Sequence, residues 1–239
     1  MSKPLSEGVL RASTGVSGAQ RNRLVVLLAL VSGATDATGF LALGGAFTSV
    51  MTGNMVLMGV AVGSGDASLV VLLLSAFGGY VAGAALGTRV AGTPQPDDPP
   101  WPAAVSRALT IELGLFAVFA VAWWLHGNDP SQGWAPPLLA LTAMALGVQS
   151  SAILRFGVPG LSTTYLTGTL TTVVVRLVSR QPLHTVRHSA ALLCGLVAGA
   201  AAGAGLVTLL PAGAPALQLV LLGAVLVSAR TPRHERVAA

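Results

Sequence analysis

The sequence predicts an all-α, polytopic membrane helix bundle, and three observations lead to that prediction. Hydrophobic residues make up 53% of the chain and charged residues only 9%, with a mean hydropathy of +0.76. Soluble domains carry about 25% charged residues. The apolar residues fall into eight segments separated by polar loops. Two of these segments are short, rich in hydroxyl groups and similar to each other, which is unusual for simple membrane-spanning helices.

The eight segments differ in whether they are long enough to cross a membrane. A helix needs about 20 residues to span the hydrocarbon core, so the second and sixth segments are too short to do so comfortably. Residues 1–20 and 231–239 are polar, and we expect them to form cytoplasmic tails, the first of them disordered. The segments cover residues 23–44, 48–63, 68–89, 103–125, 136–155, 162–178, 187–210 and 215–229.

The two short segments echo each other at a distance of 115 residues. Phe47 to Asn54 reads F-T-S-V-M-T-G-N, and Ser162 to Thr169 reads S-T-T-Y-L-T-G-T. A further match, at an offset of 116 residues, aligns residues 79–87 with residues 195–203. The sequence therefore predicts two membrane repeats, 21–126 and 136–230, joined by an external loop at 127–135.

The positions of the basic residues favour six crossings over eight. Six crossings with both termini in the cytoplasm place all 13 Lys and Arg residues on the cytoplasmic side, whereas eight crossings leave Arg89, Arg107 and Arg155 outside. Lys and Arg concentrate in cytoplasmic loops. We therefore predict two inverted repeats with six full crossings plus two short re-entrant or broken Thr-Gly segments. Eight spans arranged as 4+4 parallel repeats remain the alternative.

Asp36 is an acidic residue well inside the first predicted span. A charged side chain in the hydrocarbon core is costly and usually faces a partner, an ion or a cavity. We expect Asp36 to bind a proton, a cation or the polar end of a solute. The alternative is a structural role in capping or tying helices. Gln149, beside the counterpart of Asp36 in the second repeat, is a further candidate for the same site.

Hydroxyl, amide and glycine residues of the two short segments complete the predicted solute site. Short or interrupted apolar segments at matching places in two halves indicate a transport site, and N–H groups at helix starts suit polar ligand atoms. The alternative is that these side chains cap their own helices. The candidates are Thr48, Ser49, Thr52, Gly53, Asn54, Thr163, Thr164, Thr167, Gly168 and Thr169.

Glycines recur at every fourth position in the third and seventh segments. Small residues along one face let helix backbones approach closely in lipid. Because the two segments correspond in the repeat, we expect them to pack on each other across a pseudo-two-fold axis. The glycines are Gly79, Gly83 and Gly87 in the third segment and Gly195, Gly199 and Gly203 in the seventh.

Several other classes of function are not supported by the sequence. It contains no nucleotide-binding loop, zinc-protease motif or nucleophile elbow, so we expect neither an enzyme nor an ATP-driven pump acting alone. His184 and His188 lack a third ligand, and no metal or cofactor is predicted. The basic residues lie between apolar segments, so no nucleic-acid partner is expected. Glu112 follows Arg107 closely, and we expect it to reach the cytoplasmic interface.

Motifs in both halves connect the chain to a known family. They are Gly33-Ala-Thr-Asp-Ala37, Phe40-Leu41, Gly44-Gly45, Phe47, Ser49 and Met51-Thr-Gly-Asn54 in the first half, and Gly147-Val-Gln149 and Thr164-Tyr-Leu-Thr-Gly-Thr169 in the second. In these motifs, over roughly residues 22–230, the chain resembles the YoaK-like family of bacterial inner-membrane proteins. Ser150 stands where that family's pattern has Asn. The resemblance implies a multi-pass protein of the bacterial cell membrane, but it supplies no substrate.

Together these features predict a small secondary transporter of a small solute, coupled to a proton or cation. Its site would lie at the repeat interface near the bilayer midplane. The alternatives are a passive channel and a non-transporting membrane protein that takes part in assembly or interacts with lipids. The expected partners are the lipid bilayer and an unknown small solute, and association with a second copy of the chain stays open.

Overall fold

The computed structural model describes residues 16–128, 133–158 and 166–231. These residues form eight α-helices, six of which are long and apolar enough to cross a membrane. The predicted helical membrane bundle is therefore confirmed, with bounds close to those of the eight apolar segments. The long helices are α1 (Gly18–Ala42), α3 (Ala67–Ala91), α4 (Ala103–Leu125), α5 (Ala135–Leu154), α7 (Arg187–Leu209) and α8 (Ala214–Arg230, preceded by the 3-10 turn η2, Pro211–Gly213).

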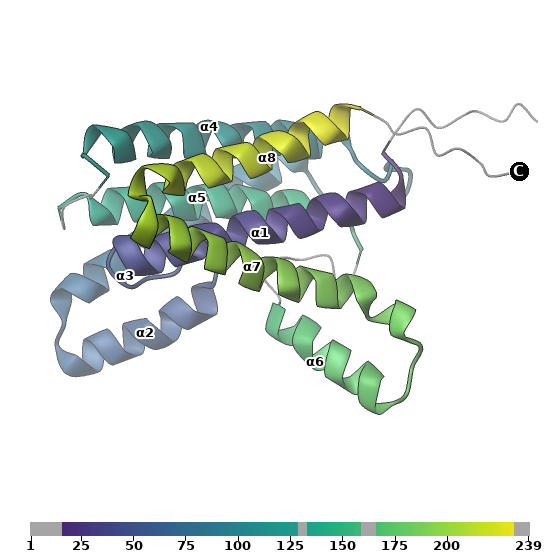
Figure 1. The fold of residues 1–239 in the computed structure, drawn as a ribbon, viewed down its shortest axis with the longest axis horizontal. Helices are drawn as coiled ribbons and strands as arrows, with labels where there is room; N and C mark the ends of the chain where they lie inside the picture. Colours follow the sequence, from purple (N-terminus) through teal and green to yellow (C-terminus); the bar gives the residue numbers. More distant parts are fainter. Residues whose placement is uncertain (1–15, 129–132, 159–165, 232–239) are drawn as a thin grey trace, which may run out of the picture.

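The two remaining helices, α2 (Met51–Ser64) and α6 (Leu166–Val178), are short and lie to one side of the bundle (Figure 1). With 14 and 13 residues, they are about 21 and 20 Å long at 1.5 Å per residue. The hydrocarbon core is about 30 Å thick. Helix α2 packs on α3, and α6 packs on α7. Neither is long enough to cross a bilayer.

The first helix begins earlier than predicted. Ser17 is its N-cap, and the Ser17 hydroxyl accepts a hydrogen bond from the backbone N–H of Gln20 (3.2 Å). Such a bond satisfies one of the free N–H groups of the first turn. Residues 18–20 are thus helical rather than part of a tail. Residues 1–15 and 232–239, which hold the rest of the predicted tails, lie outside the described residues.

The long helices pack across the two halves of the chain. Helix α3 packs along α5 and α7 packs along α1, and these are the two most extensive helix pairs. Helix α4 also contacts α5, and α8 contacts α1, while α4 and α8 touch each other. If α1–α4 are matched in order to α5–α8, the α3–α5 contact corresponds to the α7–α1 contact, and the α4–α5 contact corresponds to the α8–α1 contact. Helices α1 and α5 are the most buried of the six.

The glycine ladders mediate close helix packing, but with other partners than predicted. A Cβ atom added to these glycines would collide with or press on the backbone of the facing helix. Helices α3 and α7 do not pack extensively on each other, so the predicted contact between the two ladders is wrong. A ladder shows that a backbone lies close, but it does not identify which one. Gly79, Gly83 and Gly87 face Ala140, Met144 and Val148 of α5, and Gly195, Gly199 and Gly203 face Val26, Leu30 and Ala34 of α1.

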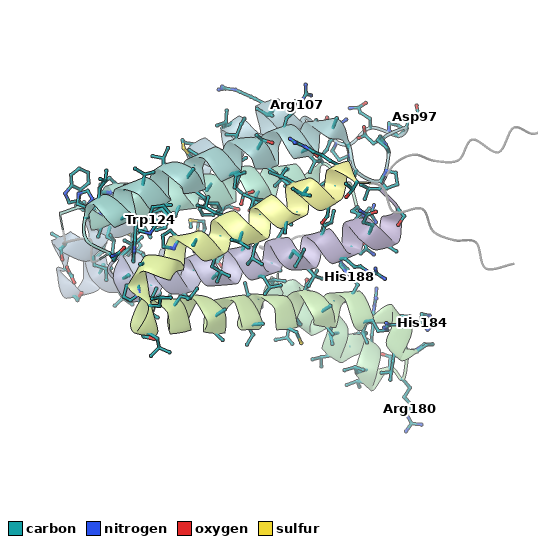
Figure 2. All side chains as sticks on the ribbon, turned by 45° about the horizontal axis from the view of Figure 1, so that its top comes forward. Asp97, Arg107, Trp124, Arg180, His184 and His188 are labelled. Atoms are coloured by element: carbon teal, nitrogen blue, oxygen red, sulfur yellow. The ribbon has the colours of Figure 1, made fainter. Side chains whose placement is uncertain are left out.

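Arg107 and Arg180 lie toward the same end of the bundle, away from Trp124, and we call it the basic end (Figure 2). There the Arg21 guanidinium lies over the Phe156 ring, 5.7 Å from its centroid, and the Gln20 amide donates to the Ser228 carbonyl (2.8 Å). Arg155 forms an ion pair with Asp98 (2.7 Å). This hydrogen bond stabilises the carboxylate and lowers the pKa of Asp98. The start of α1, the α3–α4 loop and the ends of α5 and α8 therefore meet at one end.

The opposite end is held by indole groups rather than by charges. The Trp123 and Trp124 side chains, at the end of α4, donate hydrogen bonds to the carbonyls of Pro211 and Ala212 (3.0 and 2.8 Å). Trp124 is labelled at this end in Figure 2. Tryptophan is typical of membrane–water interfaces, because its ring is apolar and its N–H is polar. The six long helices thus run between a basic end and an aromatic end.

Adjacent glycines on α3 provide a test of the packing. We expect Gly79→Ala to destabilise the protein by about 1–3 kcal/mol, because a methyl group there collides with the α5 backbone at Ala140. Gly78→Ala meets nothing within 4 Å and is expected to be neutral or stabilising by up to about 1 kcal/mol through helix propensity. Thermal unfolding in detergent micelles measures both. Equal effects of the two substitutions would contradict the α3–α5 contact.

Candidate functional site

The chain reverses after α1 and runs back along it before α2 begins. Gly44 and Gly45 have φ angles of +98° and +87°, a left-handed conformation that glycine adopts without steric cost. The segment that follows brings Thr48 beside Asp36, with 2.9 Å between the hydroxyl and the carboxylate. Asp36 lies six residues before the end of α1. Residues 43–50, here called the return segment, therefore reach back about 9 Å along the helix axis. Helix α2 thus starts inside the bundle's length rather than at its end.

The Asp36 carboxylate holds the return segment in place. It accepts the backbone N–H groups of Thr48 and Ser49 (2.7 and 2.8 Å) and both of their hydroxyl groups (2.9 and 2.5 Å). All three residues are buried. Val50, the N-cap of α2, offers no side-chain acceptor. Asp36 therefore ties α1 to the return segment just before the first turn of α2, which is the structural role named above as the alternative.

Asn54 fastens the other side of the return segment. Its side-chain oxygen accepts from the Phe47 N–H (2.9 Å), and its amide nitrogen donates to the Phe47 carbonyl (2.7 Å). The Phe47 ring stacks on Phe40 of α1, with centroids 5.1 Å apart. A Cβ at Gly53 would lie 3.3 Å from the same ring. The return segment is thus bound to the first turn of α2 as well as to α1, while Thr52 is exposed.

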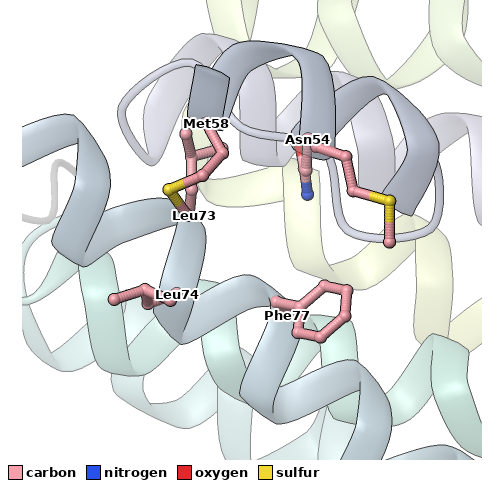
Figure 3. A pocket seen from close by; sticks show the side chains of 6 residues that line it. Asn54, Met58, Leu73, Leu74 and Phe77 are labelled. Carbon is pink, nitrogen blue, oxygen red and sulfur yellow. The ribbon is translucent and has the colours of Figure 1, made fainter. Parts of the chain in front are cut away.

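A pocket of about 250 Å³ lies between α2 and α3, next to Asn54 (Figure 3). The remaining lining residues are apolar, among them Met58, Leu73 and Phe77. Figure 3 shows the Asn54 amide nitrogen directed toward this space. The pocket fits an apolar group rather than a charged solute, because the Asn54 amide nitrogen already donates to the Phe47 carbonyl.

Gln149 links the two central helices. Its amide nitrogen donates to the Ser32 hydroxyl (2.8 Å) and to the Leu28 carbonyl (3.3 Å), so α5 is hydrogen-bonded to α1 in the buried core. Ser150, the counterpart of Asp36, donates to the Leu146 carbonyl of its own helix (2.8 Å). The acidic site of the first half is therefore not repeated in the second.

The predicted candidates of the second half are placed less completely. Thr169 is buried, whereas Thr167 and Gly168 are exposed on α6. Thr163 and Thr164 lie outside the described residues. The structure therefore unites Asp36, Thr48 and Ser49 in one cluster, and places Asn54 and Gln149 in separate hydrogen-bonded contacts.

Glu112 was not among the predicted site residues, and the structure gives it an unexpected environment. The side chain is fully buried in α4, so the prediction that it reaches the interface is wrong. Neither carboxyl oxygen has a hydrogen-bond partner among the described residues. Glu112 lies nine residues past the first residue of α4, or about 14 Å along the helix. The number of residues between the helix start and Glu112, rather than between Arg107 and Glu112, is the signal that could have indicated its depth.

Comparison with known proteins places the chain in a family by its sequence. The family described as Protein of unknown function (DUF1275) matches residues 24–228. The chain is 36% identical over 154 residues to the UPF0700 transmembrane protein YoaK of Bacillus subtilis (strain 168), a match that covers 64% of this chain and 66% of that protein. No solved structure matches the chain. These relatives are similar in sequence and carry no assigned substrate in their descriptions.

Glu112 provides a test of whether a buried group is kept at a cost in stability. We expect Glu112→Leu to raise the stability by about 1–3 kcal/mol, because it removes a buried carboxyl group that lacks a partner. Glu112→Gln keeps a polar group at the same place and is expected to change stability little. Thermal unfolding in detergent compares them with the unmodified protein. A clear loss of stability in the Leu variant would show that Glu112 has a stabilising partner.

Proposed function

The chain belongs to the DUF1275 family, a family of multi-pass membrane proteins without an assigned activity, and we propose that it is a small secondary transporter. It would act in the bacterial cell membrane and move a small solute, coupled to a proton or cation. The observation that carries the proposal is the hydrogen-bonded contact of Asp36, inside a membrane-spanning helix, with the segment that leads into a short helix. Short helices with irregular backbone near the membrane interior are typical of transporter sites.

The packing supports two inverted halves. Helices α3 and α7 each pack on the first helix of the other half, and α2 and α6 each pack on the third helix of their own. Three long helices in each half reverse the orientation of the second half relative to the first. The gathering of arginines at the basic end supports six crossings with that end, and both termini, in the cytoplasm.

The packing also suggests which parts would move. Helices α3, α4 and α5 contact one another, and α7 and α8 both pack on α1. Between these two groups the two central helices touch over only a short stretch, and α4 packs on α8. We call the two groups the α5 unit, which includes α2, and the α1 unit, which includes α6. A rocking motion would occur between these two units, not between the two halves of the sequence. Alternating exposure of a site between them would follow from such a motion.

Asp36 lies where the two units are joined. It belongs to α1, and the return segment that it holds leads to α2, which packs on α3 of the other unit. A carboxylate accepts four hydrogen bonds here, whereas a protonated carboxyl group accepts fewer and adds a donor. Among the described residues no cation pairs with Asp36, and its hydrogen-bonding neighbours are Thr48 and Ser49. Protonation or cation binding would therefore weaken the link and release α2 with its unit.

A flux measurement tests the transport proposal. The protein is reconstituted in vesicles that contain a pH-sensitive dye, and a panel of small solutes is added under an imposed proton gradient. We expect a solute of the panel to cause proton movement, and Asp36→Asn to reduce it by about tenfold or more. Asp66→Asn, at the exposed N-cap of α3, is the matched control and should transport normally. Unchanged coupled flux in the Asp36 variant would remove Asp36 from the mechanism, and flux that neither saturates nor follows the gradient would indicate a channel.

Thiol labelling tests the re-entrant path of the chain. In a background with Cys194→Ser, we expect Ser64→Cys to react with an impermeant reagent from the outside, and Thr52→Cys to react from the outside or not at all. Arg107→Cys, at the basic end, should react only from the cytoplasm. If residues 48–63 crossed the bilayer, Ser64→Cys would instead react from the cytoplasmic side.

A further inference from the structure

A second pocket, of about 430 Å³, lies at the basic end between α1 and α7. Asn22 and Arg23 line it from α1, and Arg187 and His188 line it from the start of α7. His184 contributes from the 3-10 turn η1 (Leu183–Thr185), which precedes α7. Figure 2 shows the two histidines at this end of the bundle. Arg23 lies 13 residues before Asp36 on α1, about 20 Å along the helix, and the pocket has a different chemistry.

The pocket concentrates unpaired hydrogen-bond donors. Within the part of the chain that the structure describes, neither Arg23 nor Arg187 forms an ion pair or a side-chain hydrogen bond. The Nε2 atom of His188 is buried and has no partner there either. None of the eight lining residues is acidic. The pocket thus presents two guanidinium groups and two imidazoles to any occupant.

The helix that forms one wall adds to the positive potential. Helix α7 begins at Arg187 with no side-chain cap, so its first N–H groups are free to face an anion, and its dipole favours negative charge at this end. Asn22 accepts hydrogen bonds from Arg21 through its side-chain oxygen (3.2 and 3.3 Å), which leaves its amide N–H groups to donate. Every polar group that faces the pocket can therefore serve as a donor.

We propose that this pocket binds a phosphate-bearing anion, with Arg23 and Arg187 as its principal ligands. Guanidinium groups bind phosphate oxygens through paired hydrogen bonds, and basic pockets between membrane helices on the cytoplasmic side bind lipid head groups. The remaining lining residues, Ala19, Val26 and Ala191, are apolar. That combination fits the phosphate and the first carbons of an anionic phospholipid. A free phosphate shares the same chemistry, and the two sources are distinguished by experiment.

Calorimetric titration of the full-length protein in detergent tests this site. The probes are dihexanoyl phosphatidylglycerol and inorganic phosphate, each added to the unmodified protein and to two double variants. We expect R23Q/R187Q to bind the occupant about 30-fold more weakly, since each basic residue near an anionic lipid contributes about fivefold. R89Q/R107Q is the matched control. It removes the same charge from exposed positions at the basic end that do not line the pocket, and it should bind normally.

Each outcome bears on the proposal. Arginine-dependent binding of the lipid but not of inorganic phosphate assigns the site to a head group, and the converse assigns it to a free phosphate. Equal weakening in both double variants would reduce the effect to general surface charge and overturn the proposal, as would the absence of binding to both probes. If R23Q/R187Q does not fold, the single variants R23Q and R187Q are each expected to lose about fivefold, and no loss in either would overturn the proposal. The result does not depend on transport, so the two proposals fail separately.

Discussion

The fold of the first half depends on a carboxylate that is shared between two segments of chain. Thr48 and Ser49 together bring two N–H groups and two hydroxyls into the interior, and Asp36 accepts all four. A buried donor without an acceptor costs about 1–3 kcal/mol, and irregular backbone inside a membrane is tolerated only where the protein satisfies its polar groups. Helix α2 can begin within the bundle because α1 supplies those acceptors. The return of the chain is therefore a consequence of one acidic side chain.

Several first-half motifs that resemble the family meet in the same place. Phe40 and Phe47 stack, Gly44 and Gly45 turn the chain, and Asn54 binds the Phe47 backbone. These residues are separated along the sequence, yet their contacts all stabilise the same turn of the chain beside Asp36. The motifs thus describe a structural unit that positions a chargeable group. In the proposed transporter, a gain or loss of charge on that group would change the hydrogen bonds of this unit.

Much of the architecture could be predicted because it follows from composition. The runs of apolar residues predict the number and bounds of the helices, including the two short ones. The distribution of Lys and Arg among the loops predicts six crossings. The contacts between helices could not be predicted in the same way. The ladder at Gly79, Gly83 and Gly87 defines a smooth face, but α5 or α7 would fit that face equally well on local grounds. Glu112 was misplaced because its depth was counted from Arg107 rather than from the predicted segment start at residue 103, and the contacts of its side chain depend on neighbouring helices.

Each glycine ladder packs on the first helix of the other half rather than on the other ladder, and this packing has a mechanical consequence. A glycine face in contact with a backbone leaves almost no side-chain layer between the helices, so α1 with α7, and α3 with α5, form tightly packed pairs. Each pair combines one helix from each half of the sequence. The weaker boundary runs between the pairs, where Gln149 donates to Ser32 and where Asp36 holds the segment leading to α2. Polar side chains at this boundary can exchange hydrogen-bond partners, whereas the glycine faces keep the two helices of each pair in close backbone contact. Motion within this protein is therefore expected along the boundary that carries its buried polar groups.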